Sequence, residues 1–135
     1  MTKLLTALMA SAGLALAGTA YAADTLTRDA YKAEKDKIEA AYKADKERCD
    51  TLSGNAKDVC QAEAKGKEKV AKAELDARNK NTAAARRDVV VKKADATYDV
   101  AKEKCDDLAG NAKDVCVKDA KAAHERAKAD AKKIA

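Results

Sequence analysis

The sequence contains no proline, tryptophan or phenylalanine, one histidine and only four tyrosines in 135 residues. Without proline, nothing in the composition interrupts long helices strongly. The shortage of aromatics argues against nucleic acid as a partner, because such proteins stack bases on aromatic side chains set among basic residues. His124, the only histidine, is interpreted as a solvent-facing residue of the last helix and not as a catalytic base.

Large aliphatic side chains are also scarce: after residue 22 the chain has four leucines, two isoleucines and eight valines. So few large apolar side chains cannot fill a deep core, and taken alone they would suggest disorder. Alanine and lysine dominate instead, and alanine has the highest helix propensity of all residues. The formal net charge is only +5, with 28 basic and 23 acidic residues intermixed. We therefore expect long helices around a thin core.

The first residues have the pattern of a secretory signal. Lys3 precedes an apolar run from Leu4 to Ala17, and Ala20 and Ala22 flank Tyr21 as a small-residue cleavage site. The apolar run is shorter than the ~20 residues that a membrane-spanning helix needs, so a membrane anchor is the weaker alternative. We predict a signal peptide over residues 1–22, export to the periplasm, and no stable membrane insertion after cleavage.

One twelve-residue stretch occurs twice, as CDTLSGNAKDVC at residues 49–60 and as CDDLAGNAKDVC at residues 105–116. A shift of 56 residues superimposes the two stretches and also places Tyr42 on Tyr98. Each half of the chain is predicted to form two antiparallel helices joined by a tight turn. The predicted first hairpin spans 23–78, a linker spans 79–82, and the second hairpin spans 83–135.

Each repeated stretch contains a Gly-Asn pair that predicts this turn. Gly54 and Gly110 are expected to adopt the left-handed conformation that ends a helix. Asn55 and Asn111 are expected to cap the N-terminus of the helix that follows.

The cysteines have the spacing of a disulfide across each turn. Cys49 lies five residues before Gly54 and Cys60 five residues after Asn55, so the two are level in an antiparallel hairpin, within the limit of about 7 Å between Cα atoms. We predict the pairs Cys49–Cys60 and Cys105–Cys116, in keeping with an even cysteine count and an exported protein.

Four cysteines allow two other pairings, which stay open at this point. Cysteines of the two repeats could bridge side by side, as in twin CX9C helical proteins, although the spacing here is CX10C with Gly-Asn in the middle. A zinc site is disfavoured because metal-binding cysteine pairs usually stand two to four residues apart. A thiol redox enzyme would need a Cys-x-x-Cys pair, which the sequence lacks.

With its signal-like start, its Ala/Lys-rich helices and its doubled CDxLxGNAKDVC motif, the chain resembles small exported proteins of Gram-negative bacteria labelled TolA-like or cell-envelope biogenesis proteins. The doubled motif extends the resemblance over nearly the whole chain, whereas TolA itself shares only the Ala/Lys-rich composition. The resemblance implies a periplasmic location and assigns no functional residue.

The sequence therefore predicts an all-α protein of two disulfide-linked αα-hairpins, arranged as a four-helix bundle or end to end. We expect no enzyme activity, no cofactor and no metal. The expected role is structural or that of an adaptor in the cell envelope, with other envelope proteins or anionic envelope polymers as partners. A holdase-type or polymer-binding module is the alternative, and a thiol redox or metal-binding protein is a weaker one. An alanine stripe serves packing within one chain or between chains, so oligomers are compatible with the sequence.

Overall fold

The computed structural model describes residues 25–135, which form four helices and no strand. These are α1 (Arg28–Cys49), α2 (Gly54–Lys80), α3 (Ala83–Cys105) and α4 (Gly110–Ala131). The predicted all-α fold is confirmed. The predicted signal peptide, residues 1–22, lies outside the described residues. None of the four described helices has an apolar stretch of the length needed to cross a membrane.

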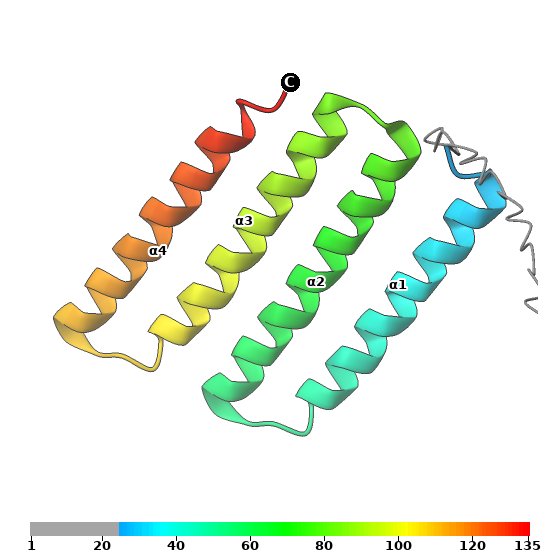
Figure 1. Ribbon diagram of the computed structural model, residues 1–135. Helices are drawn as coiled ribbons and strands as arrows, with labels where there is room; N and C mark the ends of the chain where they lie inside the picture. The colour runs from blue at the N-terminus through cyan, green and yellow to red at the C-terminus, as the bar shows by residue number, and fades with distance from the viewer. Residues whose placement is uncertain (1–24) are drawn as a thin grey trace, which may run out of the picture.

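The four helices lie side by side in one layer, each antiparallel to the next (Figure 1). Contacts between the described helices join α1 to α2, α2 to α3 and α3 to α4, so α1 and α4 do not meet. The two hairpins thus pack laterally through α2 and α3 as an open four-helix bundle, and not end to end. Such a layer has two broad faces and two outer edges, which we call the α1 edge and the α4 edge.

The layer forms because α2 has small or apolar residues on two opposite sides. Ala64 and Ala71 lie against α1, whereas Gly66 and Val70 lie against α3. Ala64 and Gly66 are two residues apart, and at 3.6 residues per turn this spacing places them about 200° apart around the helix axis. A helix that buries two opposite sides must have a neighbour on each side, which gives a row and not a closed bundle.

The two hairpins approach each other closely at Gly66. A Cβ atom at this position would lie 2.8 Å from Cβ and 3.4 Å from Cα of Ala96 on α3. Glycine inside a helix costs about 1 kcal/mol relative to alanine. Gly66 therefore lowers the helix propensity of α2 and in return allows the backbones of α2 and α3 to approach closely.

The turns inside the hairpins agree with the prediction in part. Gly54 and Gly110 have φ of 58° and 56°, the predicted left-handed conformation. They do not end a helix as predicted, because α1 and α3 end at Cys49 and Cys105 and the glycines are the first residues of α2 and α4. The prediction that Asn55 and Asn111 are N-caps was wrong: each helix begins at the glycine itself, and no side chain caps α2 or α4. Each helix begins at the glycine, so the asparagine after it is the second residue of the helix. It lies in the first turn, two positions beyond the cap.

The connection between the hairpins is shorter than the predicted linker 79–82. Helix α2 continues to Lys80, so only Asn81 and Thr82 join the hairpins. Asn81 is left-handed, with φ of 46°, and the Thr82 hydroxyl accepts a hydrogen bond of 3.2 Å from the Ala85 amide. Asparagine tolerates this conformation and threonine is a favoured N-cap, so two residues suffice to reverse the chain.

At the ends away from the disulfides, the two hairpins use different contacts. In the first hairpin the Tyr31 hydroxyl on α1 donates a hydrogen bond to the Asp76 carboxylate on α2. In the second, the residue 56 positions after Tyr31 is Arg87, which donates a 2.8 Å hydrogen bond to the Ile134 carbonyl. Each hairpin is thus held by a disulfide at one end and a polar contact at the other.

We predict that Gly66→Ala destabilises the protein although alanine is the better helix former. Overpacking of a close contact costs about 1 to 3 kcal/mol, against a gain of about 1 kcal/mol in helix propensity. Urea denaturation should show a lower free energy of unfolding, and adding Ala96→Gly should recover part of the loss by removing the opposing methyl group. A Gly66→Ala variant as stable as the parent would contradict the close approach.

We predict that Tyr31→Phe raises the pKa of the Asp76 carboxyl, because the Tyr31 hydrogen bond holds this pKa below its usual value. A carboxyl with a lowered pKa in the folded state stabilises fully above its unfolded pKa, and this contribution is lost as pH falls through the folded pKa. The difference in free energy of unfolding between the parent and Tyr31→Phe should therefore become smaller as pH falls through the pKa of Asp76 in the folded parent. An NMR titration of the Asp76 side-chain carbon that is unchanged by the substitution would rule out this bond.

Candidate interaction surface

The structure contains both predicted disulfides and so settles the pairing. Cys49 is bonded to Cys60 and Cys105 to Cys116, with Cα separations of 5.5 and 5.7 Å. Cys49 and Cys105 are among the most deeply buried side chains of the described residues. The crossed pairing is thereby excluded for this structure, and all four cysteines of the sequence are consumed in disulfides.

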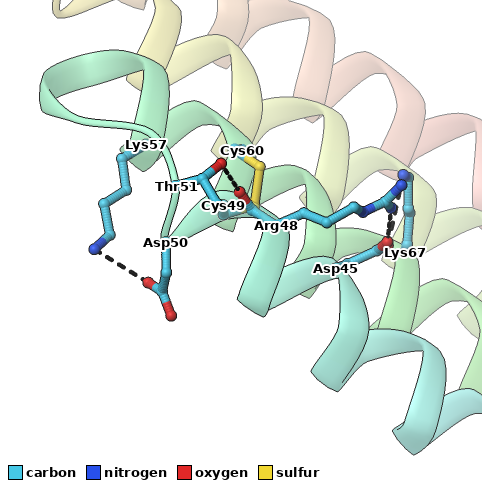
Figure 2. The surroundings of a disulfide bond; sticks show 8 residues. All are labelled: Asp45, Arg48, Cys49, Asp50, Thr51, Lys57, Cys60 and Lys67. Atoms are coloured by element: carbon cyan, nitrogen blue, oxygen red, sulfur yellow. Dashed lines mark hydrogen bonds and ion pairs between the residues drawn. A yellow bond between two sulfur atoms is a disulfide. The ribbon is translucent and has the colours of Figure 1, made fainter.

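An ion pair crosses each turn beside its disulfide. Figure 2 shows Lys57 Nζ directed at the carboxylate of Asp50, at 3.1 Å, next to the Cys49–Cys60 bond. The equivalent pair in the second hairpin joins Lys113 and Asp106 at 2.8 Å, and this hydrogen bond raises the pKa of Lys113. The cysteines, the first aspartate, the glycine and the lysine of the repeated stretch thus each have a place in the structure of the turn.

One broad face of the layer carries three parallel grooves, one between each pair of neighbouring helices. Lys67 borders both the α1–α2 and the α2–α3 groove, and Lys93 and Thr97 border both the α2–α3 and the α3–α4 groove. The three grooves therefore lie on the same face. The α1–α2, α2–α3 and α3–α4 grooves have volumes of about 160, 590 and 310 Å³. We call this side the groove face.

The central groove, between α2 and α3, is the largest of the three and has an apolar floor. The floor is formed by Gly66, Val70, Ala96, Val100 and Ala101. Charged side chains border it, and two ion pairs join its helices, Lys93–Glu74 at 2.7 Å and Lys104–Glu63 at 3.6 Å.

The opposite broad face is more polar. Its depression of about 410 Å³ runs from α1 across α2 to α3, and it is lined mainly by charged side chains together with Tyr42. Lys69 on α2 pairs with Asp99 on α3 at 3.6 Å on this side. Of the two faces, the groove face therefore offers more apolar surface to another molecule.

The interpretation of His124 as solvent-facing was wrong. Its side chain is only 13% exposed, and its Nε2 atom lies 2.6 Å from the Asp95 carboxylate on α3. The ring stacks on Tyr98 with 4.8 Å between centroids. The signal was present in the sequence, since His124 follows Cys116 and Ala120 at steps of four residues and so lies on the same side of α4 as these small side chains. His124 packs α4 onto α3, and nothing in this contact requires a catalytic role.

The equivalent position in the first hairpin is Glu68, which forms an ion pair instead. Lys72 pairs with Glu68, four residues before it on α2, at 2.7 Å, and also lies 3.5 Å from Glu39 on α1. The two hairpins thus use the same positions for different polar contacts between their helices.

Comparisons with protein families, curated proteins and solved structures found no match. Within residues 25–135, no group of three or more His, Cys, Asp or Glu side chains is placed to hold a metal ion.

We predict that replacing Cys49 and Cys60 together by alanine costs about 3 kcal/mol of stability, because the disulfide closes a short loop in the unfolded chain. The double replacement of Cys105 and Cys116 should cost a similar amount, since the two turns have nearly the same geometry. Urea denaturation of each variant against the parent measures both losses. Variants as stable as the parent would show that the disulfides add nothing to a hairpin that folds without them.

Proposed function

We propose that the protein is a non-catalytic adaptor of the bacterial cell envelope, located in the periplasm, that presents its groove face to another envelope protein. One observation carries this proposal: a single layer of helices leaves apolar grooves uncovered along one broad face. Apolar surface that is left open to water gains free energy when another molecule covers it.

The central groove suits a helical or extended partner. Its floor is made of alanine, glycine and valine, and small side chains let the backbone of a partner come close. Docking of an amphipathic helix into an apolar groove is a common mode of recognition, with anchors spaced three and four residues apart. Lys67, Lys93 and Lys104 border the central groove, and each is already paired with a carboxylate, Asp45, Glu74 and Glu63 respectively. We therefore favour a partner with an apolar stripe flanked by polar side chains of both signs.

The location is supported by the disulfides, which persist in oxidising compartments outside the cytoplasm. The signal-like pattern of residues 1–22 and the resemblance to exported envelope proteins add the periplasm as the specific compartment. A redox or zinc-binding role would need free thiolates, whereas all four cysteines form disulfides.

The proposal is tested by placing a photo-crosslinking residue at Val100, in the central groove, in cells that export the protein. The matched control carries the same residue at Lys65, which lies exposed on the opposite face. We expect one discrete crosslinked protein from Val100, absent from Lys65, and lost when Val70→Asp is added to charge the groove floor. Equal crosslinking at both positions, or none, would contradict an adaptor that uses this face.

A holdase role would use the same grooves for unfolded clients and predicts a different result. Crosslinking at Val100 would then give many products, and the purified protein would suppress aggregation of an unfolding substrate. The adaptor proposal predicts one product and no suppression at equimolar ratio.

A further inference from the structure

We propose that the α4 edge of one molecule binds the α1 edge of a second copy, so that the α2–α3 contact inside the chain is repeated between molecules. The inference rests on the internal repeat and on charged residues at the two outer edges of the layer. It concerns the edges and not the groove face, so it is independent of the proposed adaptor function.

The internal repeat places equivalent residues on an inner contact and on the outer edges. A shift of 56 residues carries α1 onto α3 and α2 onto α4. The side of α2 that packs on α3 therefore corresponds to the outward side of α4. The side of α3 that packs on α2 corresponds to the outward side of α1. Gly66 and Ala96, which meet inside the chain, correspond to Ala122 and Ala40, and both of these alanines are exposed.

Three ion pairs cross the α2–α3 contact, and each has a complementary counterpart at the edges. The inner pairs are Lys93–Glu74, Lys104–Glu63 and Lys69–Asp99. The corresponding edge residues are Lys37 with Asp130, Arg48 with Asp119, and Lys43 with Glu125. All three edge pairs are opposite in charge.

In the third pair both charges are reversed. Lys69 on the inner contact corresponds to Glu125 at the α4 edge, and Asp99 corresponds to Lys43 at the α1 edge. If only one of the two residues had changed sign, the repeated contact would place like charges together. The edge residues are also accessible, with side-chain exposures of 72% for Lys37, 74% for Arg48 and 67% for Asp130.

The α4 edge is more polar than the inner contact that it would repeat. On the inner contact, Ala62 of α2 shares a cleft with Glu103 of α3. The corresponding edge residues are Lys118 on α4 and Glu47 on α1, so we expect Lys118 to lie near Glu47 of the next molecule. Arg126 and Lys133 replace Val70 and Ala77. The contact between molecules should therefore depend on charge and weaken with salt, which screens exposed ion pairs.

Ala122 replaces Gly66 and so limits how close the two edges can come. At the spacing of α2 and α3, a Cβ atom at this position would lie 2.8 Å from the methyl group that it meets. The edges must stand somewhat farther apart than α2 and α3, which weakens the contact further. Because the edges differ from each other, the association is head-to-tail and extends into open rows instead of closing as a symmetric dimer.

The test is sedimentation velocity of the exported, disulfide-intact protein over a range of concentrations, at about 0.02 M and about 0.5 M salt. We expect mass to increase with concentration at low salt and to fall towards the monomer at high salt. Lys37→Glu and Asp130→Lys should each weaken association about three- to tenfold, because each places like charges opposite each other. The double variant Lys37→Glu/Asp130→Lys should associate as the parent does.

Two further variants separate the edges from other surfaces. Ala122→Gly should strengthen association by removing the clashing methyl group, whereas Lys65→Glu on a broad face should leave it unchanged. Circular dichroism and thermal unfolding of each variant confirm that its fold is intact. A protein that stays monomeric at low salt would overturn the proposal. Association that the single variants do not weaken, or that the double variant does not recover, would also overturn it.

Discussion

Close packing of alanine and glycine between neighbouring helices is the constraint on which the rest of the structure depends. The chain has too few large apolar side chains to fill the centre of a closed bundle, so each helix buries only a narrow stripe against its neighbour. Leu75 is the one large aliphatic side chain that is fully buried in the described residues. A small core leaves little margin of stability, so we expect the covalent links at the turns to supply a large part of it.

The sequence predicted the hairpins and their disulfides because these depend on local spacing. A cysteine five residues before Gly54 and another five residues after Asn55 can only be level if the chain reverses between them. The repeat of this spacing 56 residues later made two independent units the simplest reading. The left-handed glycines were predicted for the same reason. The asparagine caps were wrong because α2 and α4 begin two residues earlier than predicted, which moves the cap positions to Ser53 and Ala109.

The lateral arrangement could not be predicted, because it depends on contacts between residues far apart in the sequence. Alanine occurs on every side of these helices, so its positions alone do not reveal which side of α2 meets α3. Gly66 was the available signal: a glycine inside a long helix implies a close approach, although only the structure identifies Ala96 as its neighbour. The grooves were missed for the same reason, since their floors combine residues of two helices.

The single layer links the architecture to the surfaces that we propose for binding. A closed bundle would have buried the groove face and paired α1 with α4. Two spin labels, at Lys46 on α1 and Lys121 on α4, test this most directly by pulsed electron resonance in protein diluted with an excess of unlabelled copies. Three helix spacings of 8 to 10 Å predict that the axes of α1 and α4 lie about 24 to 30 Å apart, and the labels should report a separation in or above this range. A separation of about 10 Å between the helices would show that α1 packs on α4, and would contradict the open layer.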